Sequence, residues 1–251
     1  MTQPIEPVVV ITGAGKGLGG HIAQAFLNAG FRVALTDRDL QAVKDTAQAI
    51  DPEGDRTLAL ALDVTEKAQF IEVLDCVKNT WGTVQAFVNN AALTLTTAAM
   101  DITAEEFDQV IAVNLRGPFF GCQVFGQYFA DQGYGRIINI ASLAGQNGGT
   151  AAGAHYASAK GGVLTMTKIF ARQLAEQGVT VNAVAPGPLD LPIVREAVPE
   201  EKLNAIINSI IPVKALGNPA WVAQTVLHLA RPESGFITGA AWDINGGIFM
   251  R

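Results

Sequence analysis

The sequence predicts an α/β fold, a doubly wound parallel sheet of about seven strands with helices on both faces. Short runs rich in β-branched residues alternate with longer segments of helical periodicity, which favours right-handed strand–helix–strand units. Several of the runs lack apolar/polar alternation, as strands buried on both faces do. The predicted strands are Val8–Thr12, Arg32–Thr36, Thr57–Leu62, Val84–Asn89, Gly135–Ala141, Val179–Ala185 and Ala240–Ile244.

The composition bears on the class of protein. Hydrophobic residues make up 49% of the 251 residues and charged residues 16%, so the chain can bury a large core. A net charge of −6, without a run of Lys and Arg, argues against a nucleic-acid partner. The two cysteines, Cys76 and Cys122, lie far apart in apolar helical contexts and are expected to be reduced thiols.

Localisation and domain organisation follow from the same scan. No basic leader precedes the first predicted strand, and no apolar run approaches the ~20 residues of a membrane span. We therefore expect a soluble, cytoplasmic protein with no membrane partner. No Pro/Ser-rich linker, charge run or internal repeat divides the chain, so residues 1–251 are expected to form one domain.

One segment, at about 188–213, departs from the strand–helix rhythm. It is rich in proline and then forms an amphipathic pattern that predicts one helix. An insertion after the carboxyl end of a strand is well placed to be a small lid over a substrate pocket. The alternative is an ordinary surface helix. The apolar stripe comprises Leu203, Ile206, Ile207, Ile210 and Ile211.

A glycine-rich turn connects the first predicted strand to the first predicted helix, which Gly30 is expected to end. Glycines at such a turn let the backbone approach a pyrophosphate, whose charge the helix N-terminus favours. The position between a strand and a helix supports a dinucleotide site over a plain turn. The turn comprises Thr12, Gly13, Gly15, Lys16, Gly17, Leu18 and Gly19.

The second predicted strand is followed by Asp37, 18 residues after Gly19. A carboxylate there accepts hydrogen bonds from the hydroxyls of an adenosine ribose and repels a 2′-phosphate, so it favours NAD over NADP. Lys16 and Arg38 are counter-indications, because two cations near this site would tolerate the phosphate. Asp63-Val64, after the third strand, either contacts the adenine or caps the next helix through Asp63.

Tyr156 and Lys160 are four residues apart, which puts both side chains on one helix face. A phenol with a pKa near ~10 is a poor acid–base catalyst at neutral pH unless a cation stabilises its phenolate. Alone, the pair would indicate no more than a surface contact. Ser142, at the end of the fifth predicted strand, adds a hydroxyl at the edge of the sheet where a substrate is expected.

Asn114 is expected to face the core of its helix, seven residues after Phe107 and four after Val110. Pro118 has no N–H and cannot donate to the Asn114 carbonyl, which is left free to hold a water that bridges to Lys160. The alternative is a packing kink without a function.

Together these motifs resemble the short-chain dehydrogenase/reductase family over essentially the whole chain. The resemblance implies a Rossmann-type fold, a metal-free reaction on an alcohol or ketone, and a homotetramer or homodimer. It rests on the glycine turn, Asn89-Asn90-Ala91-Ala92, Asn114, Ser142, Tyr156, Lys160, Pro186-Gly187, Ile237-Thr238-Gly239 and Asn245-Gly246-Gly247.

The resemblance also implies residue roles. Tyr156 would be the general acid/base, Ser142 would polarise the reacting oxygen, and Lys160 would lower the pKa of Tyr156 and hold the ribose. Asn114 would carry the water that links Lys160 to solvent. Cofactor contacts are expected from Thr12, Gly13, Gly15, Lys16, Gly17, Leu18, Gly19, Asp37, Arg38, Asp63, Val64, Asn90, Ala91, Ala92, Tyr156, Lys160, Pro186, Gly187 and Leu189.

The sequence departs from the family at Leu191, where a Thr often reaches the pyrophosphate. The lost hydrogen bond would weaken cofactor binding by ~1 kcal/mol. The Gly- and Ala-rich 146–154 segment, which lines the pocket in relatives, leaves the shape of the substrate open. Arg195 and His155 are candidates to contact a polar group on the substrate, or are simply solvated.

The sequence is broadly similar to 3-ketoacyl-carrier-protein reductases and to NAD-dependent secondary alcohol dehydrogenases. Neither 130–134 nor Glu176-Gln177 supplies cations for an acidic carrier protein. With Asp37 favouring NAD, we expect an NAD-dependent dehydrogenase of a secondary alcohol. The alternative is an NADPH-dependent 3-oxoacyl or other ketone reductase, and a remote one is an NAD-binding protein without catalysis.

Overall fold

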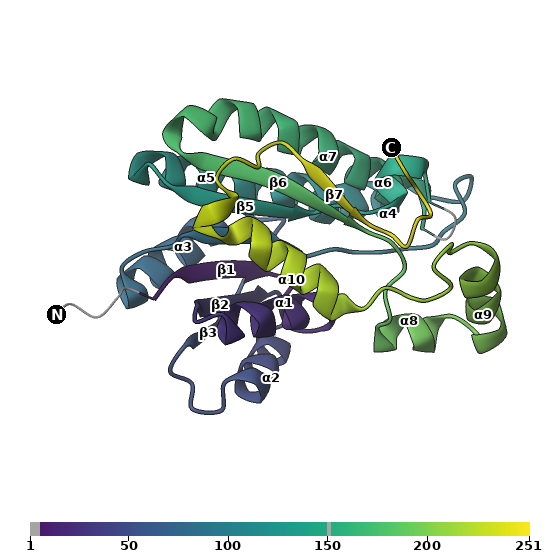
Figure 1. Cartoon of the computed structure of the whole chain (residues 1–251), viewed down its shortest axis with the longest axis horizontal. Coiled ribbons are helices and arrows are strands. Elements are labelled where there is room, and N and C mark those ends of the chain that lie inside the picture. Colours follow the sequence, from purple (N-terminus) through teal and green to yellow (C-terminus); the bar gives the residue numbers. More distant parts are fainter. Residues whose placement is uncertain (1–5, 150–151) are drawn as a thin grey trace.

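The computed structural model describes residues 6–149 and 152–251. Its strands form one seven-stranded parallel sheet in the order β3-β2-β1-β4-β5-β6-β7, which confirms the predicted fold class (Figure 1). The ends of the strands differ from the predicted ones by two residues at most. The strands are β1 Val8–Thr12, β2 Arg32–Asp37, β3 Thr57–Ala61, β4 Ala86–Asn89, β5 Gly135–Ile140, β6 Val179–Pro186 and β7 Ala241–Ile244.

Helices cover both faces of the sheet. Two separate apolar clusters show which helix lies on which face. On one face lie α1 Gly17–Asn28, α2 Leu40–Ile50 and α10 Pro219–Ala230, and on the other α3 Lys67–Trp81, α5 Gly117–Gln132 and α7 Ala154–Leu174. The shorter helices are α4 Ala104–Ile111, η1 Ala112–Arg116, α6 Ala144–Asn147, η2 Ala175–Gln177, α8 Pro192–Ala197, α9 Glu200–Ser209 and η3 Pro232–Ser234.

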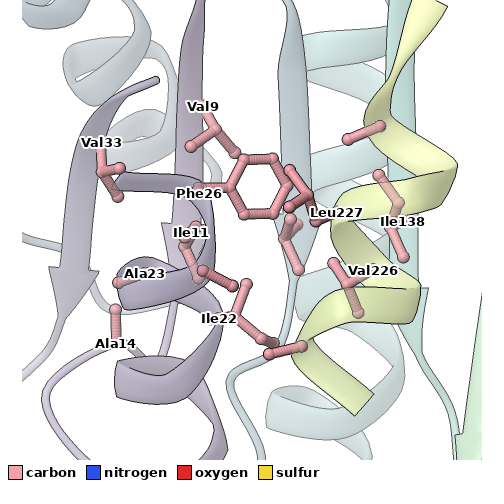
Figure 2. Close-up of a cluster of buried hydrophobic side chains, with 14 of the residues drawn as sticks. Val9, Ile11, Ala14, Ile22, Ala23, Phe26, Val33, Ile138, Val226 and Leu227 are labelled. Atoms are coloured by element: carbon pink, nitrogen blue, oxygen red, sulfur yellow. The ribbon is translucent and has the colours of Figure 1, made fainter. Parts of the chain in front are cut away.

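The first cluster joins the sheet to α1 and α10. Figure 2 shows the ring of Phe26, from α1, between strand side chains such as Val9 and Ile11 and Leu227 of α10. Phe26, Val9 and Ile11 are fully buried, and Leu227 is nearly so. Burial of this apolar surface holds α1 against the sheet. Because α1 begins within the glycine-rich turn, the position of the turn is fixed as well.

The end of α1 follows the prediction for Gly30. This residue has a φ of +86°, a conformation that glycine adopts at little cost. The amide of Gly30 donates to the Leu27 carbonyl, and the amide of Phe31 donates to the Phe26 carbonyl. These two bonds form the Schellman arrangement that ends a helix and returns the chain to the sheet.

The direction of strand addition reverses between β1 and β4, which are neighbours in the sheet. Ligands of open α/β sheets bind outside the carboxyl ends of the strands at such a reversal. The segment with α8 and α9 also lies beyond these ends (Figure 1).

The 188–213 segment contains the predicted helix as α9, and a second, short helix, α8, precedes it. Pro199 stands at the N-cap of α9 and separates it from α8, because a proline disfavours helical conformation in the residue before it. Of the predicted stripe, Leu203 is buried, but Ile210 is 43% exposed and Ile211 is buried beyond the end of the helix. The predicted amphipathic helix is therefore present as α9, although only part of its apolar stripe is buried within the helix.

Among the described residues, no helix is both long and apolar enough to span a bilayer. Both cysteines are free thiols, with Cys122 buried and Cys76 half-buried. Burial raises the pKa of the Cys122 thiol to about 12, so this thiol stays protonated at neutral pH.

Candidate active site

The glycine-rich turn packs against the end of β4. Gly13 has a φ of +65°, and a Cβ on it would lie 2.6 Å from Cα of Ala91. A Cβ on Gly19 would overlap the Gly13 carbonyl, so these two glycines are required for packing. Gly17, with a φ of +58°, has no other atom within 4 Å of an added Cβ. The turn is therefore packed against protein at Gly13 and Gly19, and it has free space at Gly17, where α1 begins.

Thr12 and Asn90 hold this turn in place. The Thr12 hydroxyl accepts from the amides of Asn90 and Ala91, at 3.0 Å each. The Asn90 side chain donates to the carbonyls of Thr12 and Gly13, at 2.9 Å each. Both side chains support the turn through these bonds, and their direct contact with a cofactor stays a prediction. Ala92, two residues on, is exposed.

Asp37 at the end of β2 points at the same turn. Its Oδ2 accepts from the Gly15 amide at 3.4 Å, and its Oδ1 accepts from the Asp39 amide. Lys16 and Arg38 are exposed. The carboxylate therefore lies directly beside the glycine turn, where the ribose of a bound dinucleotide is expected.

Asp63 does not cap the next helix. Its Oδ1 accepts from the amide and hydroxyl of Thr65, at 2.9 and 2.8 Å, and the N-cap of α3 is Glu66. The helix-cap interpretation was wrong, because this carboxylate forms a local turn instead. Val64 is buried and would meet a Cβ on Gly117 at 3.0 Å. Contact of either residue with adenine stays a prediction.

Tyr156 and Ser142 lie together at the carboxyl ends of the strands. Ser142 follows β5, and its Oγ accepts from the Ala144 amide at 3.1 Å. Burial raises the pKa of the Tyr156 phenol, and hydrogen bonding with the side chains of Ser142 and Thr94 opposes that rise. Both Ser142 and Tyr156 are half-buried. Thr94 had no local pattern to reveal it in the sequence.

Lys160 is fully buried on the same helix, α7. Its Nζ donates to the Ile140 carbonyl at 2.7 Å and lies 5.7 Å from the centre of the Tyr156 ring. Burial lowers the pKa of Lys160 to about 8. The predicted pairing of the two side chains on one face is present. The net direction of the Tyr156 pKa is nevertheless upward, since burial outweighs the stabilisation of its phenolate.

Asn114 lies in η1, a π-helix in which the Gly117 amide donates to the Ala112 carbonyl. Its side chain clamps Leu93, accepting from the Leu93 amide at 3.2 Å and donating to the Leu93 carbonyl at 2.8 Å. Asn114 is fully buried, as predicted. Phe107, however, is 43% exposed, so the predicted alignment of Phe107 with Asn114 on one helix face was wrong. The π-turn rotates the two residues apart.

The segment after β6 borders the same end of the sheet. The Gly187 amide donates to the Ile244 carbonyl, and a Cβ on Gly187 would lie 2.8 Å from Cα of Asn245. The carbonyl of Pro186 accepts from the Leu143 amide. Leu189 is buried in the core, so its side chain packs against protein. Leu191 is the N-cap of α8 and, being apolar, offers no capping oxygen.

Two residues considered for substrate recognition have protein partners. Arg195 pairs with Asp190 through Nε and Nη2, at 2.6 and 2.8 Å, on the exposed surface. His155 is 1% exposed, with Nε2 at 2.8 Å from Oε1 of Glu106. The interpretation of His155 as a solvated residue or a substrate contact was therefore wrong. Glu106 is 49 residues away in the sequence, a pairing that no local pattern indicates.

Gln146 of α6 begins the 146–154 segment, and its side-chain amide donates to the carboxylate of Asp243. Its Oε1 is buried without a hydrogen-bond partner among the described residues.

A surface cavity of about 610 Å³ lies at the amino ends of the strands, opposite the candidate site, with Phe31, Gln85 and Tyr134 in its lining. None of the predicted site residues lines that cavity.

The arrangement fits a nicotinamide dinucleotide on structural grounds. Open space above Gly17, the carboxylate of Asp37 beside the turn and the first-turn amides of α1 suit a pyrophosphate and a ribose. Tyr156, Ser142 and Lys160 lie at the same end of the sheet. No cluster of three or more potential metal ligands occurs in 6–149 and 152–251.

Comparisons with known proteins agree with this arrangement. A family model described as enoyl-(acyl carrier protein) reductase matches residues 13–248. The acetoacetyl-CoA reductase of Rhizobium meliloti (strain 1021) is 36% identical over 243 residues, 97% of this chain and 98% of that protein. The sorbitol dehydrogenase of Cereibacter sphaeroides is 31% identical over 251 residues, 96% of each chain.

A solved structure agrees in fold. The crystal structure of a short chain dehydrogenase from Bacillus anthracis superposes with a TM-score of 0.88 at 29% identity, covering 98% of this chain and 97% of that one. The family-model match at 13–248 includes Gly13 to Gly19 and the segment that carries Tyr156 and Lys160. The chain therefore belongs to the short-chain dehydrogenase/reductase family, the nicotinamide-dependent oxidoreductases that act on hydroxyl and keto groups.

Proposed function

We propose that this protein transfers a hydride between NAD(H) and a secondary alcohol or ketone, with Tyr156 as the general acid/base. The observation that carries the proposal is the placement of Tyr156, Ser142 and Lys160 at the end of the sheet that also bears the glycine turn. The side chains of Ser142 and Thr94 favour the phenolate and oppose the rise that burial causes in the pKa of Tyr156. A pre-positioned proton donor is what a carbonyl oxygen needs as it becomes an alkoxide.

In the oxidation direction, the Tyr156 phenolate takes the proton of the substrate hydroxyl while the carbinol carbon loses a hydride. When bound, the nicotinamide supplies the acceptor or donor of that hydride. Ser142 holds the reacting oxygen through its hydroxyl. In the reduction direction, the Tyr156 hydroxyl returns the proton to the carbonyl oxygen.

Lys160 and Asn114 support the proton transfer without contacting the substrate. The buried ammonium of Lys160 lies 5.7 Å from the centre of the Tyr156 ring and favours its phenolate by Coulomb attraction. The Asn114 side chain forms two hydrogen bonds with the backbone of Leu93 and so holds the segment that carries Thr94, whose side chain lowers the pKa of Tyr156. The Asn114 carbonyl cannot accept from Pro118, which leaves it available to a water.

The preference for NAD rests on Asp37. Its carboxylate lies 3.4 Å from the Gly15 amide, inside the region where a 2′-phosphate would have to fit. Lys16 and Arg38 are exposed, and screening weakens the attraction of exposed cations. A carboxylate in direct contact penalises the second negative charge more strongly than the two cations favour it.

A second candidate is reduction of a 3-oxoacyl thioester, which the name of the acetoacetyl-CoA reductase relative supports. The name of the sorbitol dehydrogenase relative instead supports oxidation of an alcohol. The non-catalytic alternative is disfavoured, because such a protein has no use for a buried Lys160 beside Tyr156 at the cofactor end.

The role of Tyr156 is tested by steady-state turnover of secondary alcohols with NAD and of ketones with NADH. We expect Tyr156→Phe to lower kcat by about 10²–10⁴-fold, since the phenol is the group that transfers the proton. Tyr134→Phe, which changes a tyrosine stacked on Arg136 at the other end of the sheet, is the matched control and should retain kcat. Equal activity of the two variants would contradict the proposal.

A further inference from the structure

We propose that His155 and Glu106 form a positioning dyad that fixes the backbone of Tyr156, and so aims its phenol at the substrate. This inference rests on the proposed role of Tyr156 and adds two residues to it. His155 precedes Tyr156 directly and is 1% exposed. A buried imidazole whose two nitrogens both have partners is a structural element, out of reach of a substrate.

The partners of His155 determine its tautomer. Nδ1 lies 2.9 Å from the backbone amide of Tyr156, which can only donate. Nε2 lies 2.8 Å from Oε1 of Glu106, whose carboxylate can only accept. The neutral ring must therefore carry its proton on Nε2 and present a lone pair at Nδ1.

The Tyr156 amide needs such an acceptor because of its place in α7. The N-cap of this helix is Gly153, which has no side chain, so Tyr156 is the third residue of the first turn. Amides in the first turn have no partner within the helix, and the first helical bond here is that of Ala157 to the Gly153 carbonyl. His155 therefore does what an N-cap side chain does elsewhere, and does it at the catalytic tyrosine.

Glu106 ties this cap to a separate element. It lies in the first turn of α4, where the Thr103 hydroxyl accepts from the Glu106 amide at 3.2 Å. Thr103 and Glu106 have the spacing of a capping box, in which the Glu carboxylate would return to the N-cap amide. Here the carboxylate instead contacts His155. Hydrogen bonds from Thr97 and then His155 keep the pKa of Glu106 below its usual range.

Glycine is needed at 153 for the same reason. A Cβ there would overlap Cε1 of the His155 ring and lie 2.7 Å from Nδ1. The Gly153 amide in turn donates to the Leu95 carbonyl at 2.9 Å. The start of α7, the 93–97 segment and α4 are thus joined around one imidazole, beside the reacting phenol.

Two substitutions separate the halves of the dyad. In His155→Asn, the side-chain oxygen can occupy the place of Nδ1, which keeps the cap on the Tyr156 amide but loses Glu106. In His155→Gln, the amide group reaches the place of Nε2, which keeps the contact with Glu106 but loses the cap. Both variants are neutral and shorter or more flexible than the ring, so a general loss of packing would affect them alike.

The activity test compares kcat, KM and NADH affinity of these variants. We expect His155→Gln to lower kcat by about 10–100-fold with KM and NADH affinity within about threefold of wild type, because a misplaced catalytic group costs turnover. His155→Asn should retain kcat within about threefold. Glu106→Ala lets the His155 ring carry its proton on Nδ1, where it can no longer accept from the Tyr156 amide, so this variant should lower kcat. Glu105→Ala, its exposed neighbour on α4, should not. Equal losses in His155→Asn and His155→Gln would overturn the proposal.

Hydrogen exchange of the Tyr156 amide tests the dyad without turnover. We expect protection of this amide in wild type and in His155→Asn, and its loss in His155→Gln. An unprotected Tyr156 amide in the wild type would overturn the inference even if the enzyme is active. A protected amide in a protein that turns over no alcohol or ketone would leave the dyad intact and contradict the proposed function instead.

Discussion

Lys160 places an ammonium in a fully buried position, where it contacts the Ile140 carbonyl. Burial lowers its pKa from 10.5 to about 8, so the folded protein holds this proton less tightly than the unfolded chain does. Below pH 8 the charged form is present in both states and its desolvation destabilises the fold. As the pH rises from 8 towards 10.5, the folded protein loses the proton first and this penalty disappears.

Lys160→Met removes the titrating group, and its effect on stability should depend on pH. The free energy of unfolding of Lys160→Met, relative to wild type, should fall by about 3 kcal/mol between pH 7 and pH 10.5. The sign follows from the wild type gaining stability over this window while the variant does not. Urea denaturation at several pH values measures it, and a difference that stays constant with pH would contradict the burial of a charged Lys160.

At the scale of elements, α8 begins without a capping oxygen. Its N-cap, Leu191, has the extended conformation that N-cap residues adopt, but an apolar side chain. The helix carries Arg195, which trypsin can cleave only after α8 opens. The stability of α8 is therefore measurable by proteolysis.

Leu191→Thr should slow tryptic cleavage after Arg195 by about fivefold, because a capping hydroxyl stabilises a helix by ~1 kcal/mol. Leu191→Val has the same shape as Thr without the hydroxyl and is the matched control. Mass spectrometry of the fragments follows this one site. Equal cleavage rates in the two variants would mean that the hydroxyl finds no amide to accept from.

The sequence predicted elements well where their signal is local. The strands follow from β-branched runs, and the end of α1 follows from Gly30, whose backbone conformation suits glycine. The lid was predicted only in part: α9 follows from its apolar stripe, but the six-residue α8 is too short to show a helical period, and Ile210 and Ile211 lie beyond the last residue of α9. The partner of His155 was out of reach, since Glu106 lies on another helix and only the tertiary fold brings the two together.

At the scale of the whole molecule, α5 and α7 share an apolar surface. Phe119 of α5 is 40% exposed and Ile169 of α7 is 50% exposed. The rings of Phe119 and Phe170 lie 5.6 Å apart edge to face, so the two helices present one patch. Exposed apolar patches of this kind serve association, and we propose that the protein is a homotetramer or homodimer that uses this surface.

Ile169→Glu should reduce the mass of the assembly in sedimentation experiments, by placing a charge in the proposed contact. Ile71→Glu is the matched control, since Ile71 is exposed to a similar degree, 47%, on α3. We expect the control to keep the wild-type mass. A wild type that sediments as a monomer would contradict the proposed assembly.

The most direct test of the account is a fluorescence titration of wild type and Asp37→Ala with NADH and NADPH. Trp81, Trp221 and Trp242 provide the signal. We expect tighter binding of NADH than of NADPH, and a loss of about 10–100-fold in NADH affinity in Asp37→Ala, since charge-assisted hydrogen bonds contribute about 1.5–3 kcal/mol. Asp45→Ala, on the exposed surface of α2, is the control. Tighter binding of NADPH by the wild type would contradict the role of Asp37, and binding of neither would contradict the oxidoreductase itself.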